Sequence, residues 1–138
     1  MRDAQRSKVY KAENAVFPMH TPTMNEGEVL SFRDEIIDSK HWYENKGYKR
    51  VKFFFRGGMR SKAWFRHEDK SISIPPWAMN KHIIIHEMAH SLTHRKDEDV
   101  AGHGKFFCQE YLALTNELLG GSLAEDLEIS FLIEGVRY

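Results

Sequence analysis

Apolar residues recur at helical spacing, three or four positions apart, in the first and the last parts of the chain. Before residue 50 this spacing predicts a helix over Arg2–Phe17 and a second one that ends before Gly47, with apolar positions at Val29, Phe32, Ile36 and Ile37. After residue 79 it predicts three further helices: Asn80–Thr93, one with Phe107, Tyr111, Leu114 and Leu118 on its apolar side, and a last one through Leu127 and Phe131. Ser122 and Glu125 are expected to open the last helix as a capping box.

The middle of the chain alternates apolar and polar residues, a pattern typical of strands. Val51–Arg56 and Lys62–Arg66 flank the turn Gly57–Gly58 and are expected to form a β-hairpin, with Ser71–Ile74 as a third strand. Helices, a small sheet and then more helices predict a single α+β domain over residues 1–138.

Composition indicates an ordinary globular protein. The 138 residues are 41% hydrophobic and 29% charged, which suffices for one buried core. The single cysteine, Cys108, excludes an internal disulfide framework and indicates a reducing compartment. No apolar run reaches the roughly 18 residues of a membrane span, and Met1–Lys8 lacks the apolar stretch of a signal peptide. We therefore expect a cytoplasmic protein with no membrane partner.

His86-Glu-Met-Ala-His90 is an H-E-x-x-H motif inside one of the expected helices. Histidines four positions apart are turned by only about 40°, so both imidazoles project from one face and suit two ligands of a tetrahedral zinc ion. Glu87 is rotated by about 100° from His86 and can lean over the open position without binding the metal. Zinc lowers the pKa of bound water to about 7, and Glu87 would take the proton as general base.

A catalytic zinc ion requires a third protein ligand, and His103 is the favoured candidate. It lies between Gly102 and Gly104, which allow the backbone to turn sharply and approach the metal closely. It also precedes Phe107 by four residues, so the following helix can press it toward the motif. With His86 and His90 it would hold one zinc ion per chain.

Three other residues could supply the third ligand. His82 and His94 continue the i, i+4 row of the motif at either end, but each lies about 12 Å along the helix axis from the far histidine of the motif. Glu110 stands where metallopeptidases with a glutamate ligand place theirs, although Leu114 occupies the position where those enzymes usually carry an aspartate. The motif could also have arisen by chance in a histidine-rich helix.

The motif and the segment that follows it, Asp97-Glu-Asp-Val-Ala-Gly-His-Gly-Lys-Phe-Phe-Cys108, resemble the SprT-like (Spartan-type) zinc metallopeptidases. Their pattern is H-E-x-x-H, a polar loop and then G-H-G-x-x-F. Two further stretches, residues 2–13 and Ile74-Pro-Pro-Trp77, are similar to small metallohydrolases of actinobacteria and their phages. The resemblance implies a zincin-like fold with a minimal metallopeptidase core, zinc on the three histidines, and Glu87 as catalytic base. A phage-encoded protein of this kind would act in the host cytoplasm.

A second group of residues lies between Lys46 and Arg66, a segment with eight basic and no acidic side chains. Because the total net charge is zero, the rest of the chain carries −8. The strand period of two places four cations and two aromatic rings on one face of the expected hairpin: Lys52, Phe54, Arg56, Lys62, Trp64 and Arg66. Such a face suits single-stranded DNA, and Spartan-type enzymes act on proteins crosslinked to DNA. The alternative is that this face has no binding function and is solvated, with its aromatic rings partly covered by an N-terminal helix.

These patterns predict a zinc metallopeptidase that hydrolyses peptide bonds of a protein or peptide substrate, acting near DNA. Two alternatives stay open: a zinc amidase or other hydrolase with a non-protein substrate, and a nucleic-acid-binding module with a degenerate zincin core. In zincins the substrate peptide lies along an exposed sheet edge beside the metal, and either strand of the hairpin could be that edge. A tyrosine, histidine or arginine is expected to stabilise the oxyanion, but the sequence does not single one out.

Overall fold

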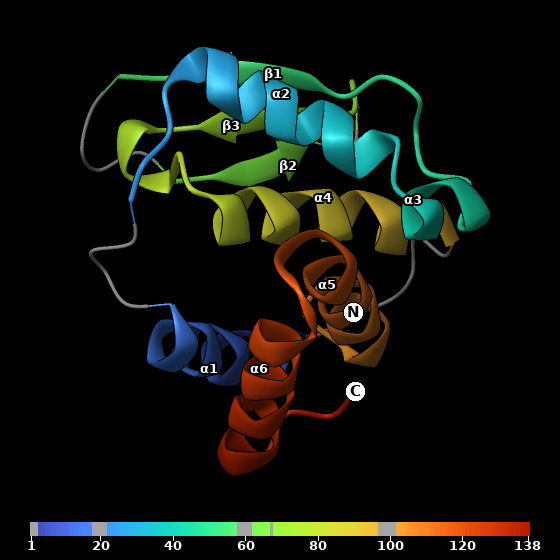
Figure 1. The fold of residues 1–138 in the computed structure, drawn as a ribbon. Helices are drawn as coiled ribbons and strands as arrows, with labels where there is room; N and C mark the ends of the chain where they lie inside the picture. The colour runs from blue at the N-terminus through green and yellow to red at the C-terminus, as the bar shows by residue number, and fades with distance from the viewer. Residues whose placement is uncertain (1–2, 18–21, 58–61, 67, 97–101) are drawn as a thin grey trace.

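The computed structural model describes residues 3–17, 22–57, 62–66, 68–96 and 102–138, with only the backbone described for residues 94–96 (Figure 1). Three helices come first: α1 (Arg6–Val16), α2 (Glu26–Ile37) and α3 (Lys40–Glu44). Three strands and a short 3-10 helix follow: β1 (Lys52–Phe55), β2 (Trp64–Arg66), β3 (Ser71–Ile74) and η1 (Pro76–Ala78). The chain ends with α4 (Lys81–Lys96), α5 (Lys105–Leu119) and α6 (Gly121–Glu134). The predicted α+β class is confirmed.

The three strands form one sheet in the order β1–β3–β2. β1 runs parallel to β3, and β2 runs antiparallel to it. The hairpin predicted from Val51–Arg56 and Lys62–Arg66 is therefore wrong, because Ser71–Ile74 lies between those two strands. All four residues of β3 are buried, as suits a central strand, whereas the charged residues of β1 and β2 suit the exposed edges of a sheet.

The second predicted helix, expected to end before Gly47, is divided into α2 and α3. Ser39 separates the two helices: its hydroxyl donates to the Ile36 carbonyl oxygen at 2.6 Å and accepts from the Trp42 backbone N–H at 3.3 Å. A serine that caps the next helix in this way ends the previous one.

The predicted capping box of Ser122 and Glu125 is also wrong. α6 begins at Gly121, directly after the one-residue turn at Gly120, and its N-terminus has no side-chain cap. Gly120 has a φ of +101°, a backbone conformation that glycine adopts readily. Because this turn is so short, Ser122 already lies inside the helix and cannot cap it.

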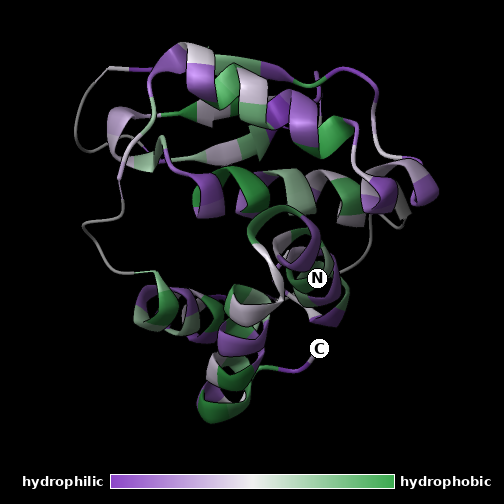
Figure 2. Cartoon of the chain, in the orientation of Figure 1, coloured by the Kyte–Doolittle hydropathy of each residue, from purple (hydrophilic) through white to green (hydrophobic). Residues whose placement is uncertain are grey.

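The core is formed where β3 and α4 meet. Six of its fully buried side chains come from these two elements: Ile72, Ile74, Ile84, Ile85, Met88 and Leu92. α2 packs on α4, α5 packs between α4 and α6, and α1 packs on α6 (Figure 1). Figure 2 shows apolar and hydrophilic stretches interleaved along these helices, as expected for helices with one buried side.

Cys108 is fully buried, and burial raises the pKa of its thiol to about 12. Among the described residues, no helix combines the length and the apolar character needed to cross a membrane.

Candidate metal centre

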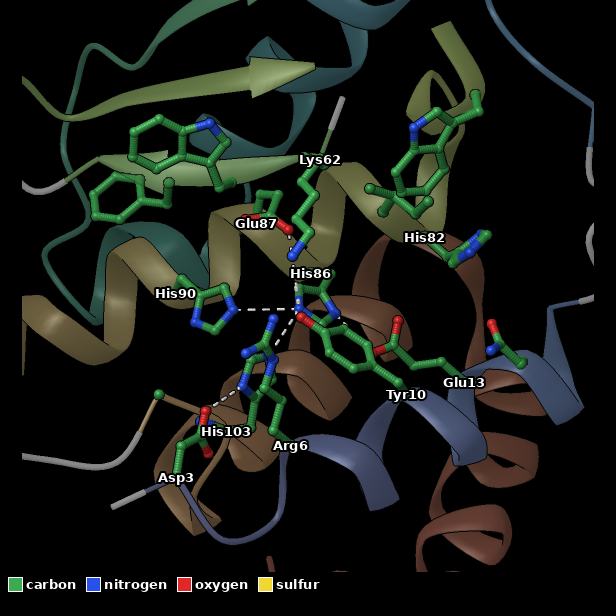
Figure 3. A pocket seen from close by; sticks show the side chains of 17 residues that line it. Asp3, Arg6, Tyr10, Glu13, Lys62, His82, His86, Glu87, His90 and His103 are labelled. Carbon is green, nitrogen blue, oxygen red and sulfur yellow. Dashed lines mark hydrogen bonds and ion pairs between the residues drawn. The ribbon is translucent and has the colours of Figure 1, made fainter. Parts of the chain in front are cut away.

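A cavity of about 830 Å³ opens between α4, α1 and the edge strand β2 (Figure 3). α4 contributes His86, Glu87 and His90, and the turn before α5 contributes His103. The cavity therefore brings together the four residues that the sequence predicts as zinc ligands and general base.

The three histidines converge through their Nε2 atoms. His86 Nε2 lies 3.2 Å from His90 Nε2 and 3.2 Å from His103 Nε2. Nitrogen ligands around one tetrahedral zinc ion, each about 2.1 Å from it, are about 3.4 Å apart. The observed 3.2 Å is close to this spacing, so the three rings need little rearrangement to bind a metal ion. His86 and His103 are buried and His90 is half-buried. This cluster could hold a metal ion.

The alternative third ligands stand apart from this cluster. His82 lines the same cavity, but its ring stacks on Phe17 with 4.4 Å between the ring centroids. Glu110 is turned toward His41, to which it is hydrogen-bonded. The side chain of His94 lies outside the described residues.

A buried carboxylate from α1 orients His86. Glu13 Oε1 lies 2.7 Å from His86 Nδ1, and the Tyr111 hydroxyl donates to Glu13 Oε2 at 3.1 Å. Burial lowers the pKa of the His86 ring, but the charge and the hydrogen bond of Glu13 outweigh this effect and raise it. With Nδ1 facing Glu13, His86 presents Nε2 to the cluster.

Asp3 holds His103 in a similar way. One carboxylate oxygen accepts a hydrogen bond from the His103 backbone N–H at 3.0 Å, and the other lies 2.7 Å from His103 Nδ1. Burial and the neighbouring His86 lower the pKa of His103, which favours the neutral ring that metals require.

Glu87 occupies the position expected of a general base. Its carboxylate lies 3.9 Å from His86 Nε2 and accepts a hydrogen bond from the backbone N–H of Phe65 in β2. Burial raises the pKa of Glu87 to about 7. A base with a pKa near neutrality can both take and return a proton.

The wall of the cavity opposite β2 is formed by α1. Tyr10 stacks on His86 with 5.7 Å between ring centroids and lies edge-on to His103 at 5.1 Å. Arg6 lies over the Tyr10 ring, 5.7 Å from its centroid, and is hydrogen-bonded to the Tyr10 hydroxyl.

The six residues predicted to form one basic and aromatic face are only partly brought together. The strand register places Lys52, Ser71 and Arg66 in one cross-strand row and Phe54, Ser73 and Trp64 in the next. β1 and β2 are separated by β3, about 10 Å apart. Arg56 follows the end of β1, and Lys62 precedes β2 and lines the cavity instead.

Reasoning from sequence missed the residues that α1 and the segment before it contribute: Asp3, Arg6, Tyr10 and Glu13. Glu13 does leave a signal, because it lies four residues after the buried Val9 and so places a carboxylate on the apolar side of the helix. Asp3 leaves none, since it lies 100 residues away from its partner His103.

Comparison with known proteins does not assign the chain to a family. No protein-family model, no curated protein and no solved structure matches it.

Proposed function

We propose that the protein is a zinc-dependent hydrolase that cleaves peptide bonds. The observation that carries this proposal is the convergence of three histidine Nε2 atoms beside the buried carboxylate of Glu87 in one cavity. His86, His90 and His103 would hold the zinc ion, as the resemblance to SprT-like metallopeptidases implies.

Zinc at this position would polarise the substrate carbonyl and lower the pKa of water to about 7. Glu87 removes a proton from the attacking water and later delivers it to the leaving amine. The Phe65 backbone N–H aims the Glu87 carboxylate toward the cavity. Glu13 and Asp3 keep His86 and His103 in the orientation that presents Nε2.

The position of β2 favours a peptide as substrate. β2 is an edge strand whose residue Phe65 lines the cavity beside Glu87. An extended peptide can add to such an edge through backbone hydrogen bonds, which would bring a scissile carbonyl past the metal. β1, the other edge, does not line this cavity.

The test is hydrolysis of casein and of a peptide library by the zinc-loaded protein, with and without single-stranded DNA. We expect Glu87→Gln to lower the rate by about 100-fold or more while zinc stays bound. Glu125→Gln, which changes an exposed glutamate of α6, is the matched control and should be fully active. Peptide hydrolysis that survives in Glu87→Gln contradicts the proposal, and activity on non-protein amides alone favours the alternative hydrolase.

A second candidate function is the binding of single-stranded DNA on the outer face of the sheet. Phe53, Phe55 and Phe65 are turned toward the core, whereas Phe54 and Trp64 are 47% and 43% exposed on the opposite face. Arg66 lies over the Trp64 ring at 5.6 Å. Exposed rings beside cations are suited to stacking with bases and pairing with phosphates.

Fluorescence anisotropy with a labelled oligothymidine tests this second function. We expect Lys52→Gln combined with Arg66→Gln to weaken binding and to reduce the slope of log affinity against log salt by about 1.4. Lys40→Gln combined with Lys105→Gln removes two exposed cations elsewhere and is the control. Equal affinity of the two double variants would exclude this face as the binding site.

A further inference from the structure

Tyr10 places a phenol ring directly against the three-histidine cluster. Its ring centroid is 5.7 Å from that of His86, with the two planes only 7° apart, and 5.1 Å from that of His103. Tyr10 is 40% exposed and lines the open cavity rather than the core. Tyr10 is neither one of the predicted zinc ligands nor the general base, so its position beside the cluster has no role assigned so far.

The hydroxyl end of Tyr10 is directed toward the cluster. Figure 3 shows the side chain running from α1 across the cavity, with its oxygen in front of the histidine nitrogens. Glu87 lines the same cavity as Tyr10.

Arg6 and Tyr10, both in α1, form a pair. Arg6 precedes Tyr10 by one helical turn, lies over its ring and donates a hydrogen bond to the phenol oxygen. The hydroxyl proton is therefore left to point elsewhere, because the guanidinium has only donors and cannot accept it. A fixed hydroxyl with an available proton beside a candidate metal centre is a hydrogen-bond donor for an anionic oxygen.

We propose that Tyr10 is a further catalytic residue, whose hydroxyl donates a hydrogen bond to the substrate carbonyl oxygen as that oxygen becomes negatively charged. Arg6 is a positioning residue that acts through the Tyr10 hydroxyl. This inference rests on the proposed peptidase function and names the oxyanion donor that hydrolysis requires.

The step balances without any further reactant. The oxygen of water forms a bond to the carbonyl carbon, the π-electron pair moves to the carbonyl oxygen, and Glu87 takes one water proton. When that pair returns, the C–N bond breaks and the nitrogen receives the proton from Glu87. Tyr10 keeps its own proton throughout, so its contribution is confined to the charged oxygen.

The test compares wild type with Tyr10→Phe, which keeps the stacked ring and removes only the hydroxyl. We expect kcat to fall by about 100-fold with little change in KM. The affinity for a phosphinic peptide, whose anionic oxygen mimics the charged intermediate, should fall by a similar factor in calorimetry. Zinc content and thermal stability should be unchanged. Tyr43→Phe, which alters a tyrosine that is 83% exposed, is the control.

Arg6→Gln tests the positioning role. We expect it to lower kcat in wild type and to have little further effect in Tyr10→Phe, because its influence passes through the hydroxyl. Equal effects in both backgrounds would overturn the role of Arg6.

Two outcomes separate the proposals. An active wild type whose kcat and phosphinic-peptide affinity survive in Tyr10→Phe would overturn the role of Tyr10 and leave the peptidase function standing. A zinc-loaded wild type that hydrolyses no peptide would overturn both.

Discussion

Two carboxylates from the N-terminal segment hold the buried histidines of the cluster through their Nδ1 atoms. Glu13 lies 2.7 Å from His86 and Asp3 lies 2.7 Å from His103. A histidine that donates Nδ1–H to a carboxylate has a fixed ring and a more basic Nε2. The metal affinity of the site is thus expected to depend on residues that need not touch the metal.

Glu13→Gln should weaken zinc binding by about 10-fold or more, because a neutral amide orients and polarises His86 less well than a carboxylate. Competition with a chromophoric chelator measures this change directly. Glu128→Gln, on the exposed side of α6, serves as the control. An unchanged zinc affinity would show that Glu13 has only a packing role.

His82 should make the fold sensitive to acid. Burial lowers the pKa of His82 to about 4, below its ordinary value of 6.5, so the folded protein favours the neutral ring. The free energy of unfolding is therefore unaffected by His82 above pH 6.5. As the pH falls from 6.5 toward 4, it decreases by up to about 3 kcal/mol, because the unfolded chain takes up a proton on His82 and the folded protein does not.

His82→Phe removes this titration and keeps a ring to stack on Phe17. Denaturant unfolding of both proteins between pH 7 and 4 should show the variant gaining stability relative to wild type as the pH falls. Parallel pH profiles for the two proteins would contradict the assigned effect.

The site residues that could be predicted are those that lie close together in the sequence or are marked by their sequence neighbours. His86, Glu87 and His90 lie within one helical turn, and His103 was recognisable by its flanking glycines. Asp3 and Glu13 could not be paired with their histidines in advance, because the packing of α1 against α6 determines which residues of α1 face the cluster.

At the scale of elements, strand positions were predictable but strand order was not. β1, β2 and β3 fall within the predicted segments, since alternation of apolar residues is a local property. A glycine turn favoured pairing of β1 with β2, yet both strands pair with β3. The central position of β3 buries Ile72 and Ile74. Burying these apolar side chains is more favourable than pairing the charged strands β1 and β2 in a hairpin.

The turn after α3 depends on a close approach between Gly47 and Trp42. A Cβ atom at Gly47 would lie 2.2 Å from Cε2 of the Trp42 ring, which is 1% exposed. Gly47→Ala should therefore lower the free energy of unfolding by about 1–3 kcal/mol, because a buried ring must move.

Gly57→Ala is the matched control, since a Cβ atom there meets nothing within 4 Å. Urea denaturation of the two variants measures the difference. Equal stabilities would mean that the Trp42 ring is free to shift.

At the scale of the whole molecule, Gln5 near the N-terminus, Arg137 near the C-terminus and the backbone of His103 are joined by hydrogen bonds. The Gln5 side chain accepts from the Arg137 backbone N–H at 2.6 Å and donates to the carbonyl oxygens of Arg137 and His103 at 3.2 and 3.0 Å. One side chain thus joins the N-terminal segment, the C-terminal segment and the turn that carries a candidate ligand.

Gln5→Ala removes these three hydrogen bonds and should lower the free energy of unfolding by about 1–2 kcal/mol. It should also weaken zinc binding, because His103 loses one of its supports. Gln109→Ala, at an exposed position of α5, controls for the loss of a glutamine. If the two variants unfold alike and bind zinc alike, the hydrogen bonds of Gln5 contribute nothing to the site.

The zinc content of the purified chain tests the central claim most directly. Elemental analysis after loading and exhaustive dialysis should find about one zinc ion per chain in wild type and in His82→Asn. His103→Ala should retain far less, because a site with two histidines is incomplete. A wild type without zinc, or a His103→Ala variant that retains as much zinc as wild type, would contradict the assignment of His86, His90 and His103 as the metal centre.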